Sequence, residues 1–222
     1  MKTFLVLLSS VVCATAYICC PPSQWEGYIG ETGGYVTDSK SDAGYISAYI
    51  VYHIDREMKK IAFDSQSTVG PTQSNVHTLQ DFDKKIQYQV EGGVCTKSAL
   101  QGSIEDNACV TDRAQLQGKV DIVGMLANSY TYTAEGIDMN VTLTVWEKGC
   151  IPCGFNAVIH SQGAHSILNG GYFNITTGIK DPSVFDVPAA CKGTMPFKKL
   201  QGLFLEPVLH RLAFNKFEKP QN

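Results

Sequence analysis

Apolar residues along most of the chain occur in short runs separated by turn residues, rather than at the spacing of a helix. Ile86, Tyr88 and Val90 alternate with polar residues, which predicts a strand with one buried and one solvated face. Comparable runs predict about nine to eleven strands. The clearest lie at residues 45–54, 59–64, 76–82, 85–90, 119–126, 129–134, 137–147, 155–161 and 165–178.

Glycine, proline and small polar residues indicate where the chain turns. The predicted turns are Asp83-Lys84, Gly92-Gly93, Ala127-Asn128 and Glu135-Gly136. Three longer stretches lack a strand pattern. Residues 31–44 are expected to form a loop or a loosely paired hairpin, residues 65–75 a loop around Gly70-Pro71, and residues 98–118 an irregular loop or a helical turn near residues 114–116.

Many strands and no clear helix before Cys191 predict a mainly β protein. The expected architecture is a meandering, curved antiparallel sheet, either a sandwich or an open barrel. No internal repeat or linker divides the strand region. Residues 17–191 are therefore expected to be one β domain, and residues 192–222 a basic tail of different composition.

The predicted strand at residues 45–54 carries apolar side chains on both faces. Tyr49 and Val51 share one face with Tyr45, whereas Ile46, Ile50, Tyr52 and Ile54 share the other. A strand of this kind is covered on both sides, by a core and by a second layer or a partner.

Residues 1–16 have the pattern of a secretory signal peptide: Lys2, an apolar segment, and the small residues Ala14-Thr15-Ala16 before the expected cleavage site. The apolar segment is too short to span a bilayer. The mature protein is therefore expected to be secreted and extracellular. With a net charge of −3, the chain lacks the excess of basic residues that is typical of a nucleic-acid-binding protein.

Seven cysteines follow the predicted signal peptide, and an oxidising compartment favours their pairing into disulfides. Because seven is odd, at least one is expected to be free or bonded to another chain. They are Cys19, Cys20, Cys95, Cys109, Cys150, Cys153 and Cys191. Cys150 and Cys153 form a Cys-x-x-Cys motif, but it lies between strands. Structural disulfides are therefore favoured over redox chemistry or a zinc site with Cys19 and Cys20.

Two N-glycosylation sequons begin at Asn140 and Asn174. A glycan must point to solvent, so alternation from Asn140 places Met139, Val141, Leu143 and Val145 inward. The same argument from Asn174 places Phe173 and Ile175 inward and Tyr172 outward. Gly170-Gly171 removes side chains in mid-strand, where a sheet bends or another group approaches closely. The inward residues are expected either to fill a core or to line an apolar pocket.

The sequence contains none of the common catalytic motifs: no Gly-x-Ser-x-Gly, no His-Glu-x-x-His and no phosphate-binding loop. The five histidines are scattered, and only His160 and His165 flank a turn where they could meet. A non-catalytic protein is therefore expected, and no catalytic residue is assigned.

Two blocks resemble the ependymin-related proteins. Gly178-Ile179-Lys180-Asp181-Pro182-Ser183-Val184-Phe185, followed by Pro188 and Cys191, is similar to the C-terminal signature of that family. Cys20-Pro21-Pro22-Ser23-Gln24-Trp25-Glu26-Gly27 is similar to its opening motif.

The resemblance implies a secreted, disulfide-bonded glycoprotein with the curved-sheet fold of bacterial lipoprotein carriers and a deep apolar pocket. It implies Cys20–Cys150 and Cys95–Cys191 disulfides and a homodimer. Cys109–Cys153 would then be the remaining pair, and Cys19 the odd cysteine. The family is also associated with calcium, although no EF-hand spacing occurs and solvated loop acids explain the carboxylates equally well. The metal ligands stay unknown.

Two functions follow as hypotheses. In the first, the protein binds a lipid or other hydrophobic small molecule in a cavity of the curved sheet. The expected ligand-binding residues, an apolar inward face, are Tyr49, Val51, Met139, Val141, Leu143, Val145, Phe173 and Ile175. In the second, it is a calcium-responsive extracellular matrix or cell-adhesion protein without small-molecule cargo. The tail is expected to be disordered or loosely packed, or a kinked amphipathic helix that contacts a membrane surface or partner.

Overall fold

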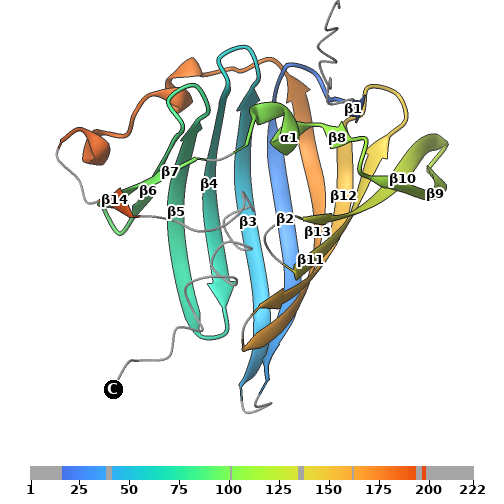
Figure 1. Ribbon diagram of the computed structural model, residues 1–222, viewed down its shortest axis with the longest axis horizontal. Coiled ribbons are helices and arrows are strands. Elements are labelled where there is room, and N and C mark those ends of the chain that lie inside the picture. The colour runs from blue at the N-terminus through green and yellow to red at the C-terminus, as the bar shows by residue number, and fades with distance from the viewer. Residues whose placement is uncertain are drawn as a thin grey trace, which may run out of the picture.

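The computed structural model describes residues 17–38, 42–100, 102–134, 138–161, 163–193 and 197–198. Within these ranges the chain forms one large sheet that is antiparallel except at one edge pair, a small two-stranded sheet, one short α-helix and two 3-10 turns (Figure 1). The predicted signal peptide and most of the predicted tail lie outside the described residues.

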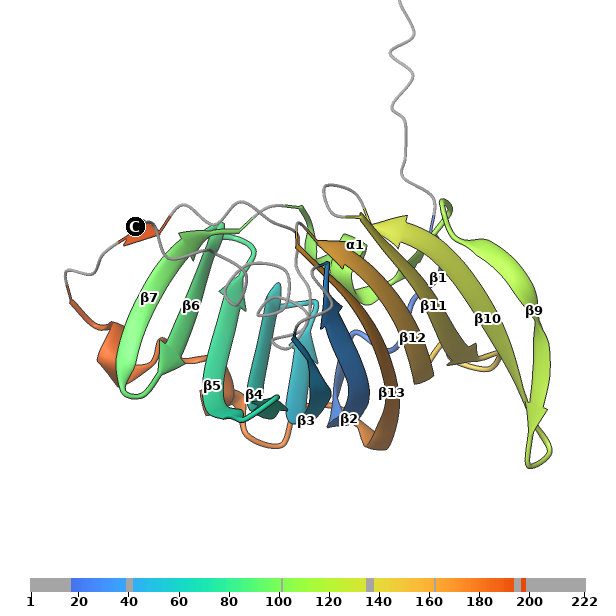
Figure 2. The ribbon, with the colours of Figure 1, turned by 90° about the horizontal axis from the view of Figure 1, so that it is seen from below.

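Twelve strands form the main sheet in the order β14-β7-β6-β5-β4-β3-β2-β13-β12-β11-β10-β9. Their bounds are β2 Gln24–Thr37, β3 Ala43–Asp55, β4 Lys60–Val69, β5 Thr72–Asp81, β6 Ile86–Glu91, β7 Val94–Ala99, β9 Gln115–Ile122, β10 Met125–Ala134, β11 Asp138–Trp146, β12 Pro152–Ser161, β13 Ala164–Thr177 and β14 Phe197–Lys198. β1 (Tyr17–Cys19) pairs separately with β8 (Val110–Thr111). Figure 2 shows the sheet curving with its two edges far apart, so it is not closed.

The expected mainly β, curved antiparallel fold is confirmed, with neighbouring strands joined mostly by hairpins. The exceptions are the parallel edge pair β7–β14 and the β2–β13 pair, in which two strands distant in sequence lie side by side at the centre. This pair joins a β2–β7 meander to a β9–β13 meander. A single continuous sheet is the result.

Several local expectations differ from the structure. Residues 65–75 are not a loop, because β4 runs to Val69 and β5 starts at Thr72, leaving Gly70-Pro71 as a two-residue turn. For residues 31–44 the hairpin alternative is the correct one, since the end of β2 pairs with the start of β3, although the pairing is regular rather than loose; residues 115–122 form β9. The helix, α1 (Ile104–Ala108), lies before the predicted helical turn. Ala127-Asn128 is not a turn either, since both residues lie within β10.

The two faces of the sheet follow from the strand register. One face, here called the inner face, carries Ile29, Ile46 and Ile50, which are fully buried, and α1 packs on it through Ile104. Figure 1 shows α1 crossing in front of the upper ends of β3 and β2. The opposite face is here called the outer face. Its upper part over β4–β7 is covered by residues 178–193, with Phe185 buried against Ala62 and Leu79.

Three disulfides tie the covering segments to the sheet: Cys19–Cys150, Cys20–Cys109 and Cys95–Cys191. The Cys95–Cys191 pair agrees with the family resemblance. The Cys20–Cys150 and Cys109–Cys153 expectations were wrong, and Cys153 rather than Cys19 keeps a free thiol. The physical reason is that successive side chains of an extended chain point to opposite sides. Cys19 therefore points toward Cys150, and its neighbour Cys20 points toward Cys109 instead.

The segment with the family signature is fixed to the sheet by an ionic cluster around Glu26, a buried residue of β2. Lys180 donates to Glu26 from its backbone N–H at 3.2 Å, and the ammonium lies 3.1 Å from the other carboxylate oxygen. His53 Nδ1 lies 3.3 Å away. Burial alone would raise the pKa of Glu26, but the hydrogen bonds and charge of Lys180, helped by His53, hold this pKa below its ordinary value.

Because the pKa of Glu26 is lowered in the folded protein, its contribution to stability is present above the ordinary value of 4.5 and is lost as the pH falls through the lowered pKa. We expect Glu26→Gln to lower the free energy of unfolding by about 1 kcal/mol at neutral pH, since Lys180 is largely exposed. Denaturant unfolding between about pH 7 and about pH 3 should show the difference from wild type disappear at the acid end. A difference that stays constant across this range would contradict the role of the carboxylate charge.

Gly33 lies where β2 and β13 approach most closely. A Cβ atom added there would stand 2.0 Å from the carbonyl oxygen of Ile167, which is backbone and cannot rotate away. We expect Gly33→Ala to destabilise the protein by about 1–3 kcal/mol, since the central strand pair must separate. Gly118→Ala on β9 is the matched control, because no atom lies within 4 Å of the added Cβ. Thermal unfolding should show a lower Tm for the first variant alone.

Candidate ligand-binding surfaces

Five aromatic side chains form a continuous row across the inner face. From β12 to β4 the rings are Phe155, Tyr172, Trp25, Tyr52 and Phe63, with successive centroids 6.1, 6.4, 5.6 and 5.9 Å apart. These separations are those of interacting aromatic pairs. The row crosses five neighbouring strands and therefore spans about 19 Å.

Gly170 makes room for one end of this row. A Cβ atom at Gly170 would lie 2.1 Å from the ring of Phe155, its partner on β12. The glycine pair in mid-strand was expected to mark a bend or a close approach. At Gly170 it marks the close approach of an aromatic ring.

The inner face is mostly apolar over β11–β4, with Glu31, Ser65, Ser67 and Ser166 as buried polar residues there, and it becomes polar at β5–β7. Met139, Val141 and Leu143 of β11 belong to the apolar cluster around the aromatic row, as does Ile175 of β13. Farther along the sheet the buried inner side chains are polar, and Gln80 donates to Gln87 at 3.0 Å. The apolar surface is thus confined to one half of the sheet.

Within the described part of the chain, Trp25 Nε1 and Ser65 Oγ are buried polar atoms on the inner face without a hydrogen-bond partner. Each side chain is only 3% exposed. Ser65 lies opposite Ile50 and Val76, at the border between the apolar and polar halves. Because buried polar groups are nearly always hydrogen-bonded, these two atoms suggest that a polar group is bound there.

Of the eight residues expected to form one inward face, five lie inward and three do not. Met139, Val141, Leu143 and Ile175 are in the main apolar cluster, and Val145 is in a neighbouring cluster with Cys150. Tyr49, Val51 and Phe173 lie on the outer face instead. Tyr49 is 48% exposed and Phe173 is 53% exposed.

The reason for the misplacement differs between the strands. On β3 the alternation was right, but the face chosen was the one with tyrosines rather than the one with Ile46, Ile50 and Ile54. On β13 the register with β2 shifts between Phe173 and Thr176, where Asn174 has a φ of 49°. This irregularity leaves both Phe173 and Asn174 exposed and places Tyr172 inward.

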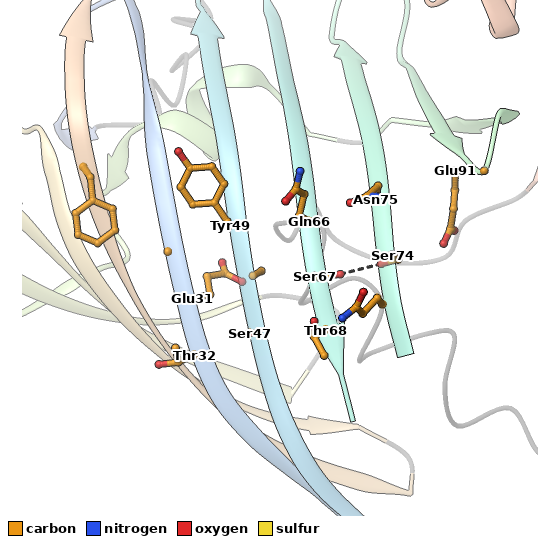
Figure 3. Close-up of a pocket in the computed structure, with 15 residues that line it drawn as sticks. Glu31, Thr32, Ser47, Tyr49, Gln66, Ser67, Thr68, Ser74, Asn75 and Glu91 are labelled. Atoms are coloured by element: carbon orange, nitrogen blue, oxygen red, sulfur yellow. Dashed lines mark hydrogen bonds between the residues drawn. The ribbon is translucent and has the colours of Figure 1, made fainter. Parts of the chain in front are cut away.

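The outer face carries a cavity of about 1020 Å³ (Figure 3). Its floor is formed by β2–β5, where two rows of paired residues point to the outer side; the cavity is also lined by Glu31, Ala48, Ser67, Ser74, Glu91 and Gly92. The first row is Gly30, Tyr49, Gln66 and Asn75, and the second is Thr32, Ser47, Thr68 and Gln73. Phe173 lines the cavity from β13. Figure 3 shows the strands in the reverse left-to-right order of Figure 1, so it looks onto the outer face.

His160 and His165 do meet across the β12–β13 hairpin, with their Nδ1 atoms 2.8 Å apart. Asp38 lies 3.1 Å from Nε2 of His165. No group of three or more histidine, cysteine or carboxylate side chains capable of holding a metal occurs in the part of the chain that the structure describes.

The free thiol of Cys153 is poorly suited to nucleophilic chemistry. It is half-buried, and burial raises its pKa. Its Sγ lies 3.3 Å from the carbonyl oxygen of Thr144, while Cys150 is already bonded to Cys19. The Cys-x-x-Cys motif therefore does not form an internal redox pair in this structure.

Sequence comparison adds the family to this description. A model of the ependymin family matches residues 70–191. The chain belongs to the ependymin family. Ependymin-related protein 1 of Haliotis asinina is 30% identical over 201 residues, which cover 84% of this chain and 96% of that protein. Mammalian ependymin-related protein 1 of Mus musculus is 22% identical over 194 residues, covering 84% and 82%.

Ependymin-related proteins are typically extracellular, and no helix among the described residues is long and apolar enough to cross a membrane. Among solved structures, an uncharacterized conserved protein from Thermus thermophilus aligns over 80% of this chain and 91% of its own, at a TM-score of 0.44 and 8% identity. This likeness is too distant to indicate a ligand.

Proposed function

We propose that this ependymin-related chain is a secreted, non-catalytic glycoprotein that binds a lipid or other hydrophobic small molecule against the apolar half of its inner face. The observation that carries the proposal is the aromatic row from Phe155 to Phe63, surrounded by buried aliphatic side chains. A row of about 19 Å is close to the length of an extended long acyl chain. Each buried methylene of such a chain would contribute about 0.8 kcal/mol.

The two unpartnered polar atoms support an amphipathic ligand rather than a pure hydrocarbon. The indole N–H of Trp25 can donate a hydrogen bond to a ligand oxygen, and the hydroxyl of Ser65 can donate or accept one. Trp25 lies level with Ile61 of β4, four residues from Ser65, so a hydroxyl, ester or protonated carboxyl group would satisfy one of the two atoms, with the alkyl part lying along the aromatic row. Ligand pockets commonly combine an apolar lining with a few such polar groups.

The homodimer implied by the family resemblance is retained in the proposal. Its support is a set of exposed apolar side chains on the outer face, on adjacent strands. Val158 pairs with Ile167, and both Ile167 and Tyr45 pair with Gly34. Ile167 is 57% exposed and Tyr45 is 56% exposed. Calcium binding also stays a prediction, and no ligand set is assigned to it.

The two tryptophans of the chain allow the inner-face proposal to be tested directly. Trp25 belongs to the aromatic row, whereas Trp146 lies on β11 outside it. In Trp146→Phe, which keeps Trp25 as the reporter, we expect dibrominated stearic acid to quench the fluorescence saturably. Bromine quenches only on contact, so unbrominated stearic acid should leave the intensity nearly unchanged.

The matched control is Trp25→Phe, in which Trp146 is the reporter and little quenching is expected. Equal quenching of both variants would indicate non-specific uptake, and quenching of neither would contradict binding along the aromatic row. Circular dichroism of both variants checks that the sheet is intact.

A further inference from the structure

The cavity on the outer face has a chemistry unlike that of the inner face. Its floor presents hydroxyl and carboxamide groups from six side chains: Thr32, Ser47, Gln66, Thr68, Gln73 and Asn75. They stand side by side on four neighbouring strands, which hold them at fixed spacings of about 4.8 Å across the sheet. Figure 3 shows Tyr49, Gln66 and Asn75 side by side along this floor.

The charge of the lining excludes several ligand classes. Glu31 and Glu91 also line the cavity, and no lysine, arginine or histidine occurs among the described residues that line it, so phosphate or carboxylate groups would find two carboxylates and no cation there. An acyl chain would bury hydroxyl and amide groups without hydrogen bonds, which is unfavourable. A neutral ligand with many hydroxyl groups matches the lining, because amides and hydroxyls can both donate and accept hydrogen bonds.

Aromatic rings flank the polar floor. Tyr49 stacks on Tyr28 with ring centroids 5.5 Å apart and planes 22° apart, which holds its ring in place. Phe173 stands on the neighbouring β13 and is half-exposed. Exposed rings of this kind offer flat apolar surfaces to the C–H faces of a sugar, while the amides reach its hydroxyls. We propose that the outer-face cavity binds a neutral saccharide.

Two sources of such a saccharide are compatible with the site. Asn174, the first residue of a sequon, directly follows Phe173 and is exposed. A glycan attached to Asn174 would therefore start at a residue next to the cavity wall. A free saccharide, or the glycan of another molecule, has the same chemistry. This site is separate from the inner face, so the saccharide proposal stands independently of hydrophobic-ligand binding.

The test uses the full-length protein secreted from a eukaryotic host and an array of neutral glycans, with affinities of the best glycan measured by saturation-transfer NMR. We expect Tyr49→Ala and Gln66→Ala each to weaken binding by roughly tenfold or more, because each removes one kind of contact. Leu126→Ala is the control: Leu126 on β10 is 50% exposed against 48% for Tyr49, and it lies outside both the cavity lining and the exposed apolar set that contains Tyr45. The mass of each variant in solution shows whether the oligomeric state has changed.

Thr176→Ala distinguishes the two sources, because it removes the sequon and leaves Asn174 in its left-handed conformation. If the source is external, wild type and Thr176→Ala both bind the array. If the chain's own glycan fills the cavity, wild type does not bind and Thr176→Ala does. The proposal is overturned if neither protein binds any neutral glycan, or if Tyr49→Ala and Gln66→Ala, made in whichever of the two proteins binds, bind as tightly as Leu126→Ala.

Discussion

Burial of the inner face is the constraint on which the rest of this structure depends. A twelve-stranded sheet that is not closed has two faces, and only one of them is strongly apolar over its central strands. The disulfides follow from this constraint, because Cys20–Cys109 joins the N-terminal segment to the end of α1, which packs on that face. On the outer face, the Cys95–Cys191 disulfide likewise ties a covering segment to the sheet, because it holds residues 189–191 against β7.

The division into two faces also separates two kinds of recognition. The inner face is rich in aromatic and aliphatic groups, with two unpartnered polar atoms at its centre. The outer face below the Glu26 cluster is polar, with isolated aromatic rings. One sheet can thus present a surface suited to an apolar molecule and another suited to a neutral polar one, since successive side chains of a strand point to opposite sides.

The sequence predicted the fold class and most strands, because alternation is clear where one face is buried and the other is wet, as at Met139–Val145 on β11. It failed where the inner face is itself polar: Ser65 and Ser67 face inward on β4, and their strand therefore resembled a loop. It also missed β2 as a long regular strand, because the glycines within residues 31–44 favoured a loop or a loosely paired hairpin. In the structure Gly33 permits the close approach of β13.

The aromatic row was harder to predict, since its five rings come from five strands and only the pairing of β2 with β13 brings the two halves together. Tyr52 was already grouped with Ile46, Ile50 and Ile54, so the correct face of β3 was available from the aliphatic residues alone. On β13 the shift near Asn174 reversed the expected direction of Tyr172 and Phe173. A single irregularity of this kind leaves no clear signal in one sequence.

The central claim is that the secreted protein holds one hydrophobic molecule against its inner face. Native mass spectrometry of protein secreted from a eukaryotic host, followed by solvent extraction and identification of whatever is released, tests it most directly. The account predicts a stoichiometric apolar or amphipathic molecule, lost on unfolding. Protein that carries no such molecule, and that takes up none when incubated with a mixed lipid extract, would contradict it.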